Sequence, residues 1–492
     1  MLLEAVLWLL SIAVAPAAAQ TALGIDSISS FNADTVPDPP TFTLPSSSNL
    51  SVSVAFCSSN SDSTPRFFVT NSSAVSTPSA SGGDNVYEID LTDGYGNFTG
   101  LFEEGGVLAV EDAGETTFEI GVSENGPIHQ SLDQLPLLGD TTSNQAIIFS
   151  PTFELSGWAE PSYPNYTLPD ANLTFTEPSS SSNFTIFLVE TDTSGSLSSL
   201  PQTACVLASQ TSAGTVTNES AWLRDDLGWR TQWIIEGLTP STNYTAYVVR
   251  AGTQVSQPMY FATKSATFNC PLVSSLPFCP NIAYPVPLPF PESTTRYDAS
   301  NIPDSITDPL LSSITNLTVS LTSFACGRDL YSPLVTCADC QREYRRWLCT
   351  VSFPRCGEAS PSNPDAVTSA APNPTATGIG AVTHHSKHNK DGAETSTVRS
   401  ALVPQASGSA PRNSNFPTVD YPYSMLLPCL ETCTAADRAC PNFLGFKCPV
   451  MRFNAAASYG VGYVDSGKED GEGDGAVSSL QDRYGNIWCN GG

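Results

Sequence analysis

Apolar and polar residues alternate in the N-terminal part of the chain, between residue 20 and about residue 140. Three stretches show the alternation most clearly: Asn49–Phe56, Val86–Leu91 and Thr116–Val122. Successive side chains of a strand point to opposite faces of a sheet, so a period of two predicts half-buried strands. Turn-forming pairs occur between and after these stretches: Asp93-Gly94, Gly105-Gly106 and Asn125-Gly126. We therefore expect an all-β sandwich domain over residues 20–140.

A second strand-rich pattern runs from residue 144 to residue 267. Its strongest feature is the stretch Leu238-Thr-Pro240-Ser-Thr242-Asn-Tyr244. This stretch is similar to the fibronectin type III signature, in which a buried tyrosine packs at a corner and its hydroxyl bonds to nearby backbone. The motif indicates an architecture and carries no chemistry of its own. We expect a fibronectin type III-like β-domain over residues 144–267.

Two later segments show helical spacing instead. In the first, Thr336 followed by Asp339 is a capping-box signal for a helix start, and Phe353-Pro354 ends the helix. Apolar residues then recur at three- and four-residue steps on one face: Cys337, Cys340, Tyr344, Trp347 and Leu348. The opposite face is polar and is expected to be exposed: Asp339, Gln341, Arg342, Glu343, Arg345 and Arg346.

The second helical segment lies between Pro428 and Pro441. Proline suits the first turn of a helix and cannot continue one, so the two prolines bracket the element. Its three cysteines fall close to a single stripe: Cys429, Cys433 and Cys440. The two segments together predict short helices that present cysteines inward.

Cysteines are concentrated in the C-terminal part of the chain. Twelve of the fourteen lie there: Cys270, Cys279, Cys326, Cys337, Cys340, Cys349, Cys356, Cys429, Cys433, Cys440, Cys448 and Cys489. Amid so many neighbours, structural disulfides are a better reading of Cys337-Ala-Asp-Cys340 than zinc or redox chemistry. The connectivity does not follow from spacing. Cys57 and Cys205 either bridge each other or are two buried thiols.

The N-terminus resembles a secretory signal. Residues 1–19 contain a short apolar run that ends in Ala17-Ala18-Ala19, and no later stretch reaches about 18 uninterrupted apolar residues. We expect cleavage after Ala19 and no transmembrane helix. Nine N-glycosylation sequons, all before residue 320, agree with passage through the secretory pathway: Asn49, Asn71, Asn97, Asn165, Asn172, Asn183, Asn218, Asn243 and Asn316.

Composition refines this organisation. Between residues 357 and 418 the sequence is dominated by Ser, Ala, Pro, Thr and Gly, which predicts a disordered linker inside a cysteine-rich region spanning 268–492. The formal net charge of −28 argues against nucleic-acid binding and against an electrostatic attachment to anionic lipid.

Catalysis finds little support in the sequence. His129 is the only histidine outside residues 384–388, so Ser-His and Cys-His systems have one candidate base. A carboxylate pair of the glycosidase type stays open, because it needs no histidine. We expect no enzyme, no catalytic residue, no metal site and no cofactor.

The motifs carry a family resemblance. Trp347-Leu-Cys349 with Phe353-Pro-Arg-Cys356, followed by Leu427-Pro-Cys429 and Cys433, resembles the frizzled-type cysteine-rich domain. With the long secreted region before it, the chain resembles the fungal Mid-type (mating-induced-death) auxiliary subunit of the stretch-activated, high-affinity calcium channel. The resemblance is specific over about residues 279–448. It implies a disulfide-rich, mainly helical domain after the β-domains.

The resemblance also implies a function. The chain would be a glycoprotein of the endoplasmic reticulum and the extracellular face of the plasma membrane, held there by a pore-forming four-repeat calcium-channel α subunit whose calcium influx it supports. The basic cluster Arg342, Arg345 and Arg346 is the candidate contact for acidic channel loops. A secreted adhesion or wall-associated glycoprotein is the alternative, since β-sandwiches, sequons and a Ser/Thr/Pro-rich linker also suit that class.

Overall fold

The structure is a computed structural model with two compact units. It describes residues 20–58, 64–72, 75–83, 85–155, 161–176, 178–191, 202–358, 382–385, 396–399, 401–449, 455, 458–460 and 489–492. The first unit comprises Met1–Ser131, Leu197–Gln210 and Gly252–Val255, and the second comprises Leu132–Ser196, Thr211–Ala251 and Ser256–Gly492. The predicted signal peptide, residues 1–19, lies outside the described residues.

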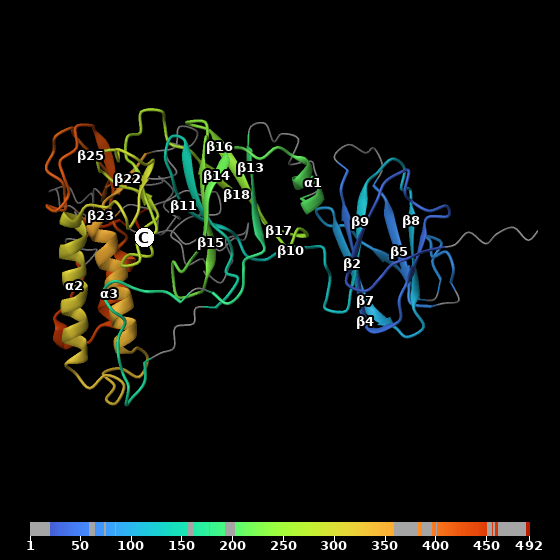
Figure 1. Ribbon diagram of the computed structural model, residues 1–492, viewed down its shortest axis with the longest axis horizontal. Coiled ribbons are helices and arrows are strands. Elements are labelled where there is room, and N and C mark those ends of the chain that lie inside the picture. Colours follow the sequence, from blue (N-terminus) through green and yellow to red (C-terminus); the bar gives the residue numbers. More distant parts are fainter. Residues whose placement is uncertain are drawn as a thin grey trace, which may run out of the picture. The chain divides into compact units, whose positions relative to one another are not determined.

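The first unit is a β-sandwich, as the alternating pattern predicted (Figure 1). One sheet has the order β1 (Thr21–Ala22), β3 (Thr41–Leu44), β8 (Gly106–Glu111), β5 (Arg66–Thr70) and β6 (Val86–Ile89). The other has the order β2 (Ser27–Phe31), β9 (Phe118–Ser123), β4 (Ser47–Phe56) and β7 (Tyr95–Phe102). Both sheets contribute fully buried phenylalanines to one core: Phe42, Phe67, Phe102 and Phe118.

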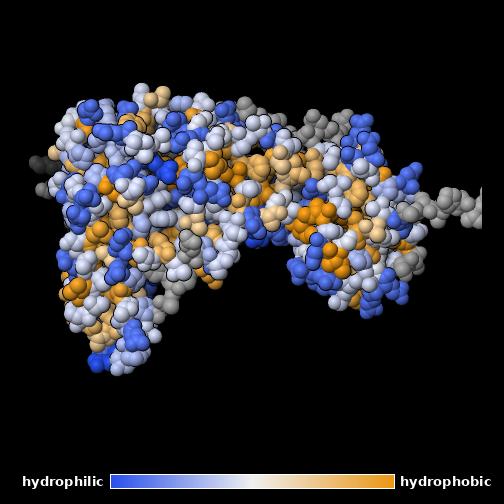
Figure 2. All heavy atoms as spheres, viewed as in Figure 1, coloured by the Kyte–Doolittle hydropathy of each residue, from blue (hydrophilic) through white to orange (hydrophobic). Residues whose placement is uncertain are grey.

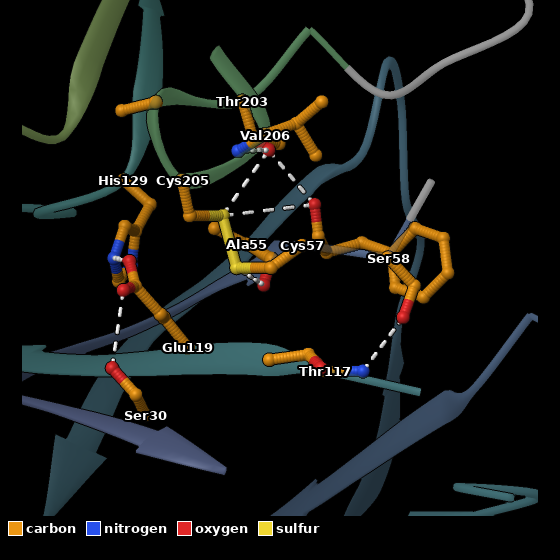
Figure 3. The surroundings of a disulfide bond; sticks show 12 residues. Ser30, Ala55, Cys57, Ser58, Thr117, Glu119, His129, Thr203, Cys205 and Val206 are labelled. Atoms are coloured by element: carbon orange, nitrogen blue, oxygen red, sulfur yellow. Dashed lines mark hydrogen bonds and ion pairs between the residues drawn. A yellow bond between two sulfur atoms is a disulfide. The ribbon is translucent and has the colours of Figure 1, made fainter. Parts of the chain in front are cut away.

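A disulfide attaches a distant segment to this sandwich. Cys57, directly after β4, is bonded to Cys205 in the short helix α1 (Ala204–Ser209), 148 residues later (Figure 3). Thr203, the N-cap of α1, donates its hydroxyl to the Phe56 carbonyl oxygen at 2.8 Å. Of the two states that the sequence allowed for these cysteines, the structure therefore has the bridge.

The second unit contains a second sandwich. Its first sheet has the order β11 (Leu137–Thr141), β12 (Gln145–Phe149), β15 (Arg230–Glu236) and β14 (Thr215–Trp222), and its second contains β13 (Phe184–Glu190), β16 (Asn243–Arg250) and β18 (Met259–Ala262). Two further strands, β10 (Gln130–Leu132) and β17 (Gln254–Ser256), include residues at which the chain passes from one unit to the other. Trp233 and Tyr244 fill the core between the sheets. Tyr244 makes the predicted corner, because the Thr239 N–H donates to its hydroxyl oxygen at 2.9 Å.

The cysteine-rich region packs in the same unit as this sandwich. Its helices are α2 (Asp304–Thr322), α3 (Cys337–Ser352), α4 (Leu430–Ala439) and the 3₁₀ turn η2 (Asn442–Leu444). Short strands accompany them: β19 (Leu272–Val273), β20 (Tyr284–Pro285), β21 (Arg296–Tyr297), β22 (Arg355–Gly357), β23 (Val382–His385), β24 (Ser396–Arg399), β25 (Leu402–Gln405) and β26 (Tyr423–Leu426). The region is thus a mixture of helices and strands, and its frizzled-like, mainly helical character remains a prediction.

The predicted disordered linker, 357–418, is too long. β22 ends at Gly357, and β25 pairs with β26, so ordered structure is present at both ends of that range. Ala401 is 1% exposed and Phe416 is 4% exposed. Although this part of the segment is rich in Ser and Pro, its few apolar residues are enough to attach it to existing cores.

Candidate functional site

Six disulfides hold the cysteine-rich region together. They are Cys270–Cys356, Cys279–Cys349, Cys326–Cys337, Cys340–Cys440, Cys429–Cys489 and Cys433–Cys448. With the Cys57–Cys205 bridge, all fourteen cysteines of the chain are paired. Two carboxylates lie close to bridges, Glu119 and Glu431, but a disulfide sulfur lacks the thiolate charge with which cysteine binds metal ions.

The disulfides converge on α3. Three of them leave this helix, from Cys337, Cys340 and Cys349. The helix starts where the sequence predicted, with a complete capping box: the Asp339 N–H donates to Thr336 Oγ1 at 3.3 Å, and the Thr336 N–H donates to Asp339 Oδ2 at 2.8 Å. α3 is therefore a fixed frame to which α2, α4 and the flanking loops are attached.

The polar face of α3 is not the exposed surface that the sequence suggested. Arg345 is 5% exposed and Gln341 is 3% exposed. Arg345 donates to the carbonyl oxygens of Asp170 at 2.8 Å and Phe278 at 3.2 Å, and also to that of Ala171. The irregular segment around residues 169–171 covers this face and satisfies the guanidinium with backbone oxygens. The expectation of an exposed basic cluster is wrong for Arg345.

The other two arginines are only partly accessible. Arg346 donates to the Gly491 carbonyl oxygen at 3.2 Å. Arg342 is 35% exposed and lies within 4 Å of three carboxylates: Asp226, Asp339 and Glu343. With Arg345 buried and the charge of Arg342 compensated by carboxylates, this face is poorly suited to attract acidic loops of a partner.

A different surface of the region is exposed and apolar. At the end where α2 stops and α3 starts, five large apolar residues have high exposed fractions: Val319 62%, Phe324 47%, Leu330 70%, Leu334 89% and Phe443 53%. We call these five residues the apolar end. The rings of Phe324 and Phe443 lie 3.9 Å apart between centroids, and orange spheres appear at the lower end of the α2–α3 region in Figure 2.

The loop of the apolar end is held in place. The Cys326–Cys337 disulfide closes it, and the Tyr331 hydroxyl, whose one proton the two acceptors share, lies 2.6 Å from the carbonyl oxygens of Thr336 and Ala439. These contacts fix the loop, so Leu330 and Leu334 stay exposed to water, whereas in a mobile loop they could fold back and become buried. The sequence signal for the apolar end was the stretch Leu330-Tyr-Ser-Pro-Leu334. From sequence alone it could not be told whether other parts of the chain bury these leucines.

The nine predicted sequons all lie at accessible positions. Six asparagines are exposed, namely Asn49, Asn97, Asn165, Asn172, Asn183 and Asn316, and three are half-buried, namely Asn71, Asn218 and Asn243. None of these asparagines is buried, so a glycan could be attached to each without a change of the fold. Asn316 lies on α2, so one sequon belongs to the cysteine-rich region.

We expect N-linked glycans on the secreted full-length chain at these positions. After enzymatic deglycosylation, mass spectrometry of peptides should find aspartate in place of the sequon asparagines, most completely at the six exposed ones. An Asn316→Gln variant should lose one glycan and keep its secretion, because this side chain is exposed. Unmodified asparagine at all nine positions would contradict the expected passage through the secretory pathway.

The one histidine outside 384–388 is buried in the first sandwich. His129 is 1% exposed, its Nδ1 lies 3.2 Å from Ser53 Oγ, and its Nε2 lies 3.4 Å from Glu119 Oε2. Ser53 is fully buried, and its Oγ accepts hydrogen bonds from the backbone N–H groups of Ile128 and His129. Ser53 and His129 are buried, so they form a polar network with Glu119 inside the first sandwich; Figure 3 shows His129 beside Glu119.

Within the described residues, no helix is both long and apolar enough to cross a membrane.

Comparison with known proteins identifies relatives along almost the whole chain. The family described as "Mid1: Stretch-activated Ca2+-permeable channel component" matches residues 47–473. The stretch-activated cation channel MID1 of Cryptococcus neoformans is 33% identical over 91% of this chain and 81% of its own length. The stretch-activated cation channel yam8 of Schizosaccharomyces pombe is 26% identical over 46% of this chain and 40% of its own.

A third relative matches a similar share of this chain. The stretch-activated cation channel MID1 of Saccharomyces cerevisiae is 28% identical over 44% of this chain and 34% of its own length. The family match runs from the start of β4 through the second sandwich and into the cysteine-rich region up to residue 473. The chain therefore belongs to the Mid1 family of stretch-activated, Ca²⁺-permeable channel components.

Proposed function

We propose that this protein is an extracellular auxiliary subunit of a plasma-membrane calcium channel, where it supports calcium influx by assembling with a separate pore-forming α subunit of four repeats. The observation that carries this proposal is the Mid1 family match over residues 47–473, because its description names a component of a channel. A component implies further subunits, and the chain would be attached to the membrane through them.

The disulfides support the extracellular position. Fourteen paired cysteines require an oxidising compartment, such as the lumen of the endoplasmic reticulum or the cell exterior. The accessible sequons suit the same compartments. The protein would therefore fold in the endoplasmic reticulum and act on the outer face of the plasma membrane.

We further propose that the apolar end is the contact with the channel. Exposed groups of large apolar side chains on soluble proteins mark interaction sites, since leaving them in water costs free energy. Here the loop that carries these side chains is held by a disulfide and by the Tyr331 hydroxyl, so the backbone would lose little conformational entropy on binding. The channel's extracellular loops are the proposed occupant, in place of the basic face of α3.

A double substitution at the apolar end tests this contact. Leu330→Asp with Leu334→Asp places two charges where an apolar partner would pack, and both side chains are 70% or more exposed, so the fold should survive. Loss of anchor residues typically costs 2 kcal/mol or more, so the affinity for the channel should fall at least about 30-fold. Co-purification with the α subunit and stress-induced calcium uptake should fall together.

The matched control is Leu155→Asp, at a leucine of the same unit that is 80% exposed and lies far along the chain from the apolar end. This variant should keep both co-purification and calcium uptake. If the double variant co-purifies with the α subunit at the normal level, the channel binds elsewhere on this chain. If the unmodified chain co-purifies with no channel from native membranes, the adhesion alternative replaces the auxiliary-subunit proposal.

A further inference from the structure

Two strands of eight residues each form borders of their sheets. β7 borders one sheet of the first unit, where it pairs with β4, and β14 borders one sheet of the second unit, where it pairs with β15. In an antiparallel pair, every second residue directs its N–H and C=O groups away from the partner strand. Among the described residues, no second strand pairs with the free side of β7 or β14. Each strand therefore presents an open edge.

The other borders of the two sandwiches are shorter or covered. β1, β2, β6, β10, β11 and β18 have two to five residues each. β13 has seven, but a neighbouring segment bonds along it: the Leu188 N–H donates to Ser212 Oγ at 3.1 Å, and the Ala213 N–H donates to the Leu188 carbonyl oxygen at 2.6 Å. In the part of the chain that the structure describes, β7 and β14 are thus the long open edges of the sandwiches.

Neither edge has the charged residues that commonly protect an open strand. Natural proteins place lysine, proline or a bulge on such edges, because unpaired backbone groups are a template on which another chain can add a strand. β7 contains no charged residue, and β14 contains one, Glu219. The bulge of β14 lies between Val216 and Asn218, so its second half, up to Trp222, remains regular. Leu101 of β7 and Val216 of β14 are 47% and 42% exposed, which adds apolar surface to both edges.

Each of these strands instead carries a glycosylation sequon in its interior. Asn97-Phe-Thr lies in β7, and Asn218-Glu-Ser lies in β14. Asn97 is exposed and Asn218 is half-buried. An N-linked glycan is bulky and well hydrated, and no described strand lies beyond either edge to limit where the sugar extends. A chain that approached β7 or β14 would therefore meet the sugar before it reached the backbone.

We propose that N-linked glycans on Asn97 and Asn218 shield the open edges of β7 and β14 and so prevent a second copy of this chain from adding a strand there. In the modification, the asparagine amide nitrogen bonds to the anomeric carbon of the sugar, loses a proton and displaces the diphosphate of a lipid-linked sugar donor. The proposal rests on the passage through the secretory pathway proposed above, and it does not depend on the channel contact.

Removing both sugars tests the shield. Asn97→Gln with Asn218→Gln, made in the secreted full-length chain, leaves two bare edges that can pair antiparallel with the same edges of another copy. Sedimentation velocity at equal protein concentrations should show the self-association constant rising at least tenfold over the unmodified chain, which corresponds to about 1.4 kcal/mol. In the unmodified chain, mass spectrometry of deglycosylated peptides should find aspartate at both positions.

The matched control removes two glycans from positions away from any open edge. Asn165 lies outside the strands and Asn316 lies on α2, and both are exposed. Asn165→Gln with Asn316→Gln should sediment like the unmodified chain. A rescue adds Leu101→Lys and Ala221→Lys to the edge variant, at exposed positions of β7 and β14. Because edge lysines block strand addition, the rescued chain should return to the unmodified self-association constant, which a misfolded chain would not do.

Several outcomes would overturn the proposal. If Asn97 and Asn218 are unmodified while the other sequons carry sugar, the shield does not exist, although the secretory passage stands; if all nine are unmodified, both proposals fail. Equal sedimentation of the edge variant and the control would mean that the edges need no shield. Association that the two lysines leave unchanged would mean that it arises elsewhere on the chain. Should the edge variant not be secreted, enzymatic trimming of the glycans on the folded chain, with and without the two lysines, makes the same comparison.

Discussion

Removing the Cys279–Cys349 bridge is expected to lower the free energy of unfolding of the second unit by about 4 kcal/mol. This disulfide closes a loop with a sequence separation of 70 and joins the segment before β20 to α3. Both cysteines are 0% exposed and belong to the core that also contains Phe353 and Tyr284. The loss would take away a large part of the stability of a typical domain.

The experiment compares two double variants. Cys279→Ala with Cys349→Ala should be retained in the endoplasmic reticulum, and any secreted protein should unfold at lower guanidinium concentration. Cys326→Ala with Cys337→Ala opens a separation of only 11, in the loop of the apolar end, and should cost about 3 kcal/mol or less. If Cys279→Ala with Cys349→Ala were secreted at the normal level and unfolded at the normal guanidinium concentration, the Cys279–Cys349 bridge would not be what holds α3 in place.

The sequence predicted the elements whose signals are local. α3 begins at Cys337 because Thr336 and Asp339 satisfy each other's backbone donors, and this needs no knowledge of the rest of the fold. The strands of the first sandwich followed from alternation, and the tyrosine corner followed from a short motif around Tyr244. In each case the determining contacts lie within a few residues.

α2 was not predicted, although it is the longest helix described. Its sequence is rich in Ser and Thr and contains Pro309, all poor helix formers. A buried stripe of Ile306, Leu310 and Ile314 stabilises it. Hydroxyls such as that of Thr318 are satisfied within the helix, since they donate to the carbonyl four residues earlier. The i, i+4, i+8 spacing of the stripe was the available signal.

The burial of Arg345 was beyond sequence reasoning for a different reason. A charged side chain on the polar face of an amphipathic helix is usually solvated. Its carbonyl partners, Asp170 and Phe278, lie 175 and 67 residues away along the chain. Only tertiary structure brings such acceptors together. The same holds for the cavity beside Arg345, whose lining residues come from segments that no motif connects.

Breaking the buried ion pair between Asp140 and Arg355 is expected to destabilise the second unit by about 3–5 kcal/mol. The Arg355 Nε donates to Asp140 Oδ2 at 2.7 Å, and the side chains are only 5% and 2% exposed. Arg355 also donates to the Gly139 carbonyl oxygen at 2.8 Å. The pair thus fastens β22 of the cysteine-rich region to β11 of the second sandwich. It carries this effect because loss of Arg355 would leave the buried carboxylate of Asp140 with only Lys264, at 3.2 Å, as a cationic partner.

The pair also makes stability depend on pH. Burial alone would raise the pKa of Asp140, but the nearby charges of Arg355 and Lys264 outweigh it and lower the pKa below the ordinary 3.8. A carboxyl whose pKa is lower in the folded state contributes stability above its unfolded pKa. That contribution is lost as the pH falls below about 3.8 through the folded-state value.

We therefore expect Arg355→Met to lower the free energy of unfolding at pH 7 and to flatten its decline below pH 3.8. The double variant Arg355→Met with Asp140→Asn removes both charges, so it should recover part of the loss. Urea unfolding of the unmodified chain, Arg355→Met, Asp140→Asn and the double variant at neutral and acid pH measures the coupling. Arg66→Met is the control, because its ion pair with Glu88 is 42% and 39% exposed and contributes little. Additive losses in the double variant would mean that the two side chains act independently and that β22 is fastened by its neighbouring disulfide instead.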